Sequence, residues 1–290
     1  MAATVTASFN ALIDDLKLTA RQREVADARV SHLQSYFSPP MWQIGKVPWV
    51  IGSYGRETLV RWERDIDVMV ALSVPAYWES FKSDSRRYLY WVRDYLNKEY
   101  PDTKVSSKEV AVRMELSNNL QVDLVPAFAR SGGGFYIPDG SKGWTSTNPP
   151  FHDELVADSN VRLDGSLKPL IRVMKAWNIA NGGHLRSFHL EMMVERMWQT
   201  RTSMSQLPIA LASTLAAAAG WANQPFGDPW MPTQRIDAYL TATDRAKVVG
   251  FFTTDGANAA KANEAEAAER QAEAVDLWDA IFARKSVAFH

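Results

Sequence analysis

Residues 51–70 read IGSYGRETLVRWERDIDVMV and hold a glycine-serine pair between two apolar runs. The short apolar run at 47–51 predicts a strand that Gly52 ends. Asp65 to Ala71 predicts a second strand. Asp65 and Asp67 are two residues apart, so both side chains should point to the same face of a sheet. This stretch therefore predicts two acidic side chains on one sheet face, preceded by a strand and a glycine turn.

A third carboxylate follows in a predicted hairpin. Lys108 to Leu116 and Leu120 to Val125 are apolar-rich runs that flank Ser117-Asn118-Asn119, and asparagine tolerates turn conformations. Asp123 lies on the second run. If that strand is a neighbour of Asp65 and Asp67, the three carboxylates repel one another unless cations neutralise them. Oxygen ligands suit a hard cation such as Mg²⁺, and two ions could serve one phosphoryl-type transfer.

Gly52 and Ser53 could hold a phosphate beside these carboxylates. Gly52 would let a phosphate approach the backbone, and Ser53 offers a hydroxyl and an N–H group. Each feature alone has a simpler interpretation, namely an ordinary turn or a solvated strand face. Their order and spacing together favour a nucleotide site.

The rest of the chain predicts helices before and after the strands. The first is a short helix through Phe9 and Leu16, and a capping box at Thr19 opens a long helix that ends before Pro39. Residues 129–152 are rich in Gly, Ser and Pro and predict a long loop. Further helices are expected over Tyr77 to Tyr95, Leu167 to Trp177, Phe188 to Trp198, Gln206 to Ala219 and Ala257 to Arg284. The pattern predicts an α+β fold with a sheet domain at 1–160, a helical lobe at 161–290 and a cleft between them.

Composition narrows the class of protein. The chain has 290 residues, 46% of them hydrophobic, a net charge of −1 and no cysteine. This balance is typical of a globular protein and argues against a polybasic nucleic-acid binder. Without cysteine there is no disulfide, thiolate metal site or cysteine nucleophile. The N-terminus lacks a signal-peptide pattern, and no stretch has the length of a membrane span. We expect a cytoplasmic protein with no membrane association.

The quoted stretch resembles the glycine-serine and Asp-x-Asp motifs of polymerase-β-type nucleotidyltransferases. Residues 170–178 (LIRVMKAWN) and 187–191 (SFHLE) are similar to segments of one branch, the CD-NTases, bacterial relatives of cyclic GMP-AMP synthase. The similarity to that branch extends to residues 135–138 and 148–152 with Trp144, to Asp228-Pro229, and to the closing helix with Trp278 and Phe282. The resemblance implies a nucleotidyltransferase sheet domain with a long N-terminal spine helix and a helical second lobe.

The resemblance also implies roles for individual residues. Asp65, Asp67 and Asp123 would be the catalytic carboxylates and would bind two Mg²⁺ ions, with Mn²⁺ able to substitute. Gly52 and Ser53 would hold the triphosphate of the donor nucleotide. Lys175 and Ser187, the latter at an expected helix N-cap, would contact that triphosphate from the helical lobe. The substrates would be nucleoside triphosphates (ATP, GTP, CTP or UTP), and the cyclic product would act on a separate effector protein.

Several other side chains have open interpretations. Arg56, Arg61 and Arg64 could line a phosphate entrance or form a solvated rim. Tyr136 and Trp144 are candidates for stacking on a base. His189 and Glu191 are interpreted as a packed histidine and a helix-start acid. Animal relatives carry a zinc ribbon with cysteine ligands, which this chain cannot form, so we expect no stable nucleic-acid binding.

Three functions compete at this stage. The favoured one is synthesis of a cyclic di- or trinucleotide in anti-phage signalling, with release of pyrophosphate at each bond. The second is nucleotidyl transfer to an RNA end, a protein or a small molecule. The third is a non-catalytic nucleotide-binding scaffold, which would be free to lose one of the three carboxylates.

Overall fold

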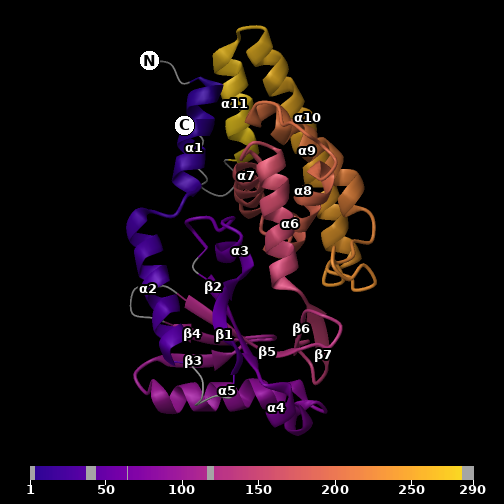
Figure 1. The fold of residues 1–290 in the computed structure, drawn as a ribbon. Coiled ribbons are helices and arrows are strands. Elements are labelled where there is room, and N and C mark those ends of the chain that lie inside the picture. Colours follow the sequence, from indigo (N-terminus) through magenta and orange to yellow (C-terminus); the bar gives the residue numbers. More distant parts are fainter. Residues whose placement is uncertain (1–3, 37–43, 64, 116–120, 283–290) are drawn as a thin grey trace. The chain divides into compact units, whose positions relative to one another are not determined.

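Figure 1 shows the computed structural model, which describes residues 4–36, 44–63, 65–115 and 121–282. The chain divides into a unit built around a sheet and a unit built of helices. The sheet unit comprises Thr19–Glu57 and Glu63–Asp153, and the helical unit comprises Met1–Leu18, Thr58–Trp62 and Glu154–His290. The α+β fold class is confirmed.

Seven strands form one mixed sheet within the described residues. The path runs β1-β2-β5-β4-β3, and β6 joins β5 to β7. β2 and β5 are parallel, whereas every other neighbouring pair is antiparallel. The strands are β1 (Ile44–Ile51), β2 (Asp65–Leu72), β3 (Lys104–Ser107), β4 (Val112–Glu115), β5 (Gln121–Ala129), β6 (Phe135–Pro138) and β7 (Trp144–Thr147).

The two faces of this sheet carry different residues because side chains alternate along each strand. Val68 and Leu124 belong to a core that includes Tyr88 and Val92 of α5, and α5 runs along that side of the sheet (Figure 1). Met69 and Val125 belong to a second, smaller cluster on the opposite face. Asp65 and Asp67 lie an even number of positions along the strand from Met69, and so does Asp123 from Val125, so the three aspartates point to the face of this second cluster. The helices of the sheet unit are α2 (Ala20–Tyr36), α3 (Gly52–Gly55), α4 (Val74–Phe81) and α5 (Ser85–Glu99).

The helical unit packs around large aromatic side chains. Trp177 stacks on Phe252 with ring centroids 4.4 Å apart. Phe9 of α1 meets the edge of Trp278 at 4.9 Å, so the first helix packs in this unit. Its helices are α1 (Val5–Leu16), α7 (Leu167–Ala180), α8 (Ser187–Trp198), α9 (Leu207–Ala222), α10 (Ala242–Ala267) and α11 (Gln271–Phe282). α6 (Pro149–Arg162) begins in the sheet unit and continues into the helical one. The domain boundary at residue 160, which falls within α6, stays a prediction.

Most predicted elements are confirmed, including the capping box at α2. The Thr19 N–H donates to Oε1 of Gln22 at 3.0 Å, and the Gln22 N–H donates to Oγ1 of Thr19 at 3.2 Å. The single helix predicted over Tyr77 to Tyr95 is wrong, because α4 and α5 are separate. Asp84 causes the break by capping α5, where its side chain accepts from the Arg86 N–H at 3.0 Å.

Two further predictions need correction. The expected loop at 129–152 contains the hairpin of β6 and β7, which continues the sheet from β5. The helix predicted from Ala257 to Arg284 begins earlier, as α10, and is interrupted near Glu269, which has a positive φ of 61°. Its anchors Trp278 and Phe282 are fully buried as expected, and residues 283–290 lie outside the described part. Of the helices described, none has both the length and the apolar character that crossing a bilayer requires.

Candidate active site

Two carboxylates lie side by side on the parallel strands β2 and β5. Asp67 is in register with Asp123, and strands in a sheet are about 4.8 Å apart. Asp65 precedes Asp67 on the same face of β2. The prediction that a neighbouring strand brings Asp123 beside the other two aspartates is therefore confirmed. The parallel register fixes this arrangement, because a shift of one residue would send one carboxylate to the opposite face.

Burial makes the charge on Asp67 costly. Burial is the largest cause that raises the pKa of Asp67 to about 7, and the charge of Asp123 adds to it, while Arg56 opposes the shift. Burial also raises the pKa of Asp65, against the lowering effect of Arg113. A group of this kind favours a cation that can neutralise it.

Arg113 on β4 is a member of this cluster that the sequence reasoning missed. It is in register with Asp123. Its Nε donates to Oδ1 of Asp123 at 2.7 Å, and its Nη2 donates to Oδ2 of Asp123 at 2.6 Å and to Oδ2 of Asp65 at 2.9 Å. The bond to Asp123 is the main cause that raises the pKa of Arg113 above its already high value. A signal for it was present, because a hairpin centred on Asn118 puts residue 113 opposite residue 123.

Gly52 lies against Asp67 at the end of β1. α3 begins at Gly52, whose φ of 69° is in the left-handed region that glycine adopts most readily. A Cβ at this position would overlap Oδ2 of Asp67 and lie 3.0 Å from its Cγ. Ser53 follows in the same short helix. Glycine is therefore required here both by the backbone conformation and by the approach of the carboxylate.

The three arginines between Ser53 and Asp65 do not form one group. Arg56 is buried in the sheet unit, and its Nη1 lies 3.4 Å from Oδ1 of Asp153. Arg61 belongs to the helical unit, where it pairs with Asp15. Arg64 lies outside the described residues. Arg56 therefore acts on the site through its charge rather than as an exposed rim residue.

Lys175 and Ser187 belong to the helical unit. The Lys175 side chain is 2% exposed, and its Nζ lies 2.7 Å from Oε1 of Glu191, which is 0% exposed. Glu191 is thus the partner in a buried ion pair between α7 and α8, and its interpretation as a helix-start acid was incomplete. Ser187 is the first residue of α8, and Arg186 occupies the N-cap position that was expected for Ser187.

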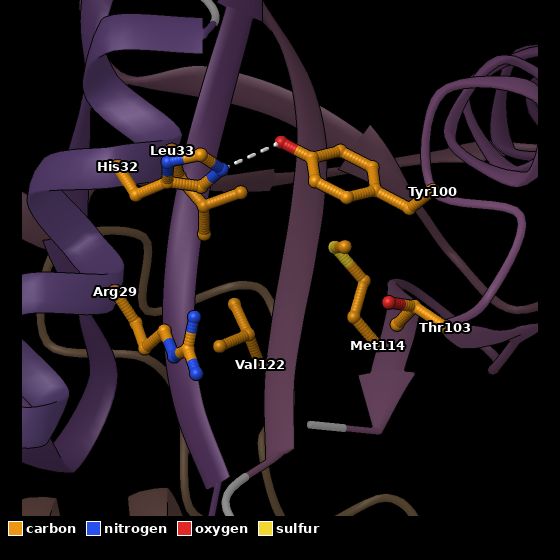
Figure 2. A pocket seen from close by; sticks show the side chains of 7 residues that line it. All are labelled: Arg29, His32, Leu33, Tyr100, Thr103, Met114 and Val122. Atoms are coloured by element: carbon orange, nitrogen blue, oxygen red, sulfur yellow. Dashed lines mark hydrogen bonds between the residues drawn. The ribbon is translucent and has the colours of Figure 1, made fainter. Parts of the chain in front are cut away.

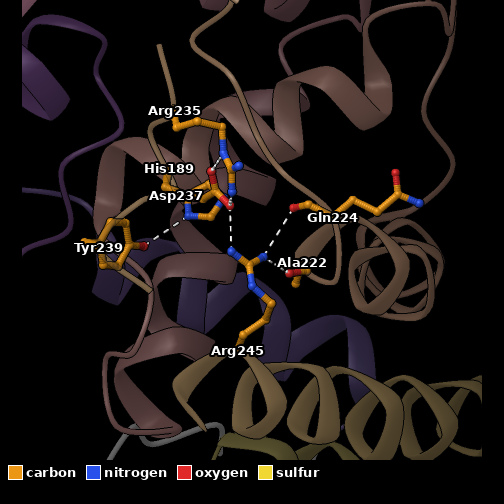
Figure 3. A network of polar contacts seen from close by, with 7 residues as sticks. All are labelled: His189, Ala222, Gln224, Arg235, Asp237, Tyr239 and Arg245. Carbon is orange, nitrogen blue, oxygen red and sulfur yellow. Dashed lines mark hydrogen bonds and ion pairs between the residues drawn. The ribbon is translucent and has the colours of Figure 1, made fainter. Parts of the chain in front are cut away.

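A network of polar side chains surrounds His189 in the same unit (Figure 3). The ring Nδ1 lies 3.0 Å from the hydroxyl of Tyr239, and burial lowers the pKa of His189 to about 4. Asp237 accepts from Arg235 at 2.5 and 2.6 Å and from Arg245 at 2.6 Å. His189 is therefore neutral near pH 7, which confirms its interpretation as a packed histidine.

Tyr136 and Trp144 pack within the sheet unit. The Tyr136 ring stacks on Trp78 at 5.3 Å, and Trp144 lies 5.5 Å from Phe128. Nε1 of Trp144 donates to the carbonyl of Lys82 at 3.1 Å. Both half-buried rings thus belong to an aromatic cluster, and their stacking on a base stays a prediction.

The sheet unit also has a small pocket on its other face (Figure 2). Its volume is about 90 Å³, and it is lined by Arg29, His32, Leu33, Tyr100, Thr103, Met114 and Val122. Met114 and Val122 alternate with Arg113 and Asp123, so the pocket opens on the face opposite the carboxylates. Ligand pockets usually exceed about 300 Å³, so it is too small for a nucleotide.

The carboxylates offer the right atoms for a hard divalent cation. Asp65, Asp67 and Asp123 provide oxygen ligands only, which suits Mg²⁺. Across the described ranges, no three acidic or imidazole side chains converge as a ready-made metal site in this conformation. Arg113 instead makes contacts with two of the three carboxylates. The residues fit the cation by their chemistry, and Mg²⁺ stays a prediction.

Comparisons with known proteins agree with this geometry. A model of a family described as the Second Messenger Oligonucleotide or Dinucleotide Synthetase domain, SMODS, matches residues 3–160. The chain is 28% identical over 194 residues to a probable cyclic nucleotide synthase of Bacillus cereus, a match that covers 56% of this chain and 59% of that protein. It is 30% identical over 126 residues to a cyclic AMP-AMP-AMP synthase of an Acinetobacter species, over 42% of this chain and 36% of that protein.

Solved structures share the fold over nearly the whole chain. E. coli CdnC with ATP has a TM-score of 0.81 at 17% identity and matches 97% of this chain and 98% of its own. CdnG of Bradyrhizobium diazoefficiens in complex with GTP has a TM-score of 0.72 at 12% identity, over 99% and 98% of the two chains. The sheet order and the paired aspartates are those expected of the polymerase-β-type nucleotidyltransferase fold. Within that superfamily, the match over residues 3–160 shows that the chain belongs to the SMODS family of bacterial CD-NTases.

The raised pKa of Asp67 predicts a stability change with pH. The folded chain holds a proton on Asp67 up to about pH 7, whereas the unfolded chain releases it near pH 3.9. Stability therefore falls as pH rises through this window. We expect Asp67→Asn to be more stable than the wild type at pH 8 in EDTA, with an advantage about 2 kcal/mol larger than at pH 5. Urea unfolding at both pH values measures this. An equal stability advantage of Asp67→Asn at the two pH values would contradict the raised pKa of Asp67. Asp65 is half-exposed, so the stability advantage of Asp65→Asn should change less with pH.

Gly52→Ala tests the close approach to Asp67. We expect a loss of about 1–3 kcal/mol in the free energy of unfolding, because alanine is strained at this φ and its Cβ displaces the carboxylate. Gly132→Ala is the matched control, since a Cβ there meets nothing within 4 Å. Denaturant unfolding compares the two variants, and equal stability would show that Asp67 moves freely.

The buried ion pair predicts opposite effects of single and double substitutions. Lys175→Met should destabilise the fold by about 3–5 kcal/mol, because it leaves the Glu191 carboxyl buried without its cationic partner. The double variant Lys175→Met with Glu191→Leu should recover most of that loss. Thermal unfolding measures the stability of both variants. A double variant as unstable as Lys175→Met would mean that the unpaired Glu191 carboxyl does not cause the loss of stability.

Proposed function

We propose that this protein is a metal-dependent nucleotidyltransferase that joins nucleoside triphosphates into a cyclic di- or trinucleotide and releases pyrophosphate. The observation that carries the proposal is the register of Asp67 with Asp123 on parallel strands, with Gly52 against Asp67. Membership of the SMODS family supports it. The chain spans 59% and 36% of the two curated relatives named above, so their activities come to it by proposal only.

Asp65, Asp67 and Asp123 would hold two Mg²⁺ ions, for which Mn²⁺ could substitute. When bound, the ions would neutralise the phosphates and make the acceptor hydroxyl more acidic. The backbone at Gly52 would let the donor triphosphate approach, and Ser53 would offer it a hydroxyl. From the helical unit, Ser187 would donate to the same triphosphate. Lys175 would contact the triphosphate only after leaving Glu191, because the two side chains form a buried ion pair whose charges cancel.

The substrates would be ATP, GTP, CTP or UTP. ATP and GTP are bound in the solved structures of CdnC and CdnG, which share this fold. An oxygen of Asp123 would accept the proton of the attacking 2′- or 3′-hydroxyl. A linear intermediate would then rebind so that its own triphosphate becomes the donor. The product would act on a separate effector in anti-phage signalling, within the cytoplasm.

A product assay tests the proposal. Purified protein is incubated with radiolabelled triphosphates and Mg²⁺ or Mn²⁺, without any acceptor, and then treated with phosphatase. We expect a phosphatase-resistant product, reduced by more than about 10²-fold in Asp65→Asn with Asp67→Asn. Asp94→Asn, on the exposed side of α5, is the control and should retain activity.

Two outcomes would contradict the synthase. A double variant that keeps full activity would remove the carboxylates from the mechanism. Label that appears only when RNA, protein or a small molecule is added would favour transfer to another acceptor. Omitting each triphosphate in turn identifies the bases of the product.

A further inference from the structure

We propose that Arg113 is a positioning residue of this site, which fixes the carboxylate of Asp123 and competes with divalent cations for Asp65. The inference rests on the proposed function, because it assigns a role to Arg113 within the same carboxylate cluster. It goes beyond that function by adding a cationic side chain from a strand that carries none of the three aspartates.

The bond to Asp123 is geometrically specific. Both carboxylate oxygens of Asp123 accept from the guanidinium, at 2.7 and 2.6 Å. A two-point contact of this kind fixes the plane of the carboxylate as well as its position. The side chains are only 18% and 12% exposed, so water competes weakly for these bonds. Arg113 thus determines which oxygen lone pairs of Asp123 face the site.

The bond to Asp65 is of a different kind. Nη2 of Arg113 is shared between Oδ2 of Asp123 and Oδ2 of Asp65, and the bond to Asp65 is the longer of the two, at 2.9 Å. The Asp65 side chain is 47% exposed, which leaves it accessible to an incoming ion. Within the described residues, Arg113 contacts these two aspartates and not Asp67. A cation that binds Asp65 therefore meets Arg113 at that oxygen.

The charge balance gives the sign of the effect. When all three carboxylates are ionised, as metal binding requires, they carry −3, and Arg113 reduces that sum to −2. A divalent cation is attracted more strongly to the cluster when that positive charge is absent. Replacing Arg113 by a neutral residue should therefore tighten metal binding, although it impairs the orientation of Asp123. A residue needed only for folding would not produce tighter binding.

Lysine and glutamine at position 113 separate charge from geometry. Lysine keeps the charge but lacks the planar fork, whereas glutamine lacks the charge. Titration of the nucleotide-free full chain with Mn²⁺, followed by electron paramagnetic resonance, measures the affinity. We expect Arg113→Gln to bind Mn²⁺ about three- to tenfold more tightly than the wild type, and Arg113→Lys to bind within about twofold of it.

The turnover rate then tests the bonding geometry of residue 113 apart from its charge. At saturating Mn²⁺ and triphosphate, both variants should lose about tenfold or more in kcat, because neither holds the Asp123 carboxylate by two bonds. Lys104→Gln is the matched control, since Lys104 forms an exposed ion pair with Glu115 across β3 and β4. It removes one positive charge from the same sheet and should change neither quantity.

Either measurement can overturn the inference. If folded Arg113→Gln binds Mn²⁺ no more tightly than the wild type, there is no competition for Asp65. If Arg113→Lys turns over at the wild-type rate, the two-point contact does not position Asp123.

Two further measurements, one with Mn²⁺ and one in EDTA, separate this inference from the proposed function. Wild-type protein that binds Mn²⁺ no better than Asp65→Asn with Asp67→Asn would contradict the metal site itself. The Tm values of Arg113→Gln, Asp123→Asn and their double variant in EDTA then test the contact alone. We expect the double variant to lose no more Tm than the worse single variant. Losses that simply add would show that the two side chains are not coupled, and would overturn the positioning role.

Discussion

The repulsion between Asp67 and Asp123 is the constraint on which the sheet unit depends. Parallel pairing of β2 and β5 puts two carboxylates in register, and burial of Asp67 removes much of the water that would solvate them. Such a pair persists in a folded protein only if protons or cations reduce the charge. Two responses follow from the structure: burial raises the pKa of Asp67 to about 7, and Arg113 bonds to Asp123. The strand order matters because it places β4, and with it Arg113, on the far side of β5.

Buried charges in the helical unit also need compensation, and there it comes from side chains of opposite charge. Asp237 has two arginine partners, and Lys175 has Glu191, so each of these buried acids meets a positive charge within the unit. Burial keeps His189 neutral instead. Buried pairs of this kind contribute little net stability, yet removing one partner is costly, so they restrict how α7 and α8 pack. Their pairing contrasts with the carboxylate cluster, where three acids meet one arginine.

The sequence predicted the parts of this fold that depend on local pattern. The period-two alternation of Asp65 and Asp67, the capping box at Thr19 and the helical faces of α7 to α9 are properties of neighbouring residues. The hairpin of β6 and β7 was missed because its pairing depends on the end of β5 and on packing against Trp78. The break between α10 and α11 was missed because an alanine- and glutamate-rich segment favours helix throughout. Arg113 was missed for another reason: its role appears only when the predicted hairpin is paired residue by residue.

The ion pairs of Arg56 and Arg113 bear on the metal dependence that is proposed for this site. Arg56 pairs with Asp153, and Arg113 is held by Asp123 and Asp65. Both guanidinium groups therefore balance carboxylates of the protein and leave little positive charge for a triphosphate. A triphosphate brings about four further negative charges to a cluster that already has an excess of acids. In the proposed reaction, neutralising that charge would fall to metal ions bound with the substrate, as phosphoryl transfer generally requires. Such a site would repel a free triphosphate and admit one that is paired with a cation, so the proposed substrate and metal ions would bind together for electrostatic reasons.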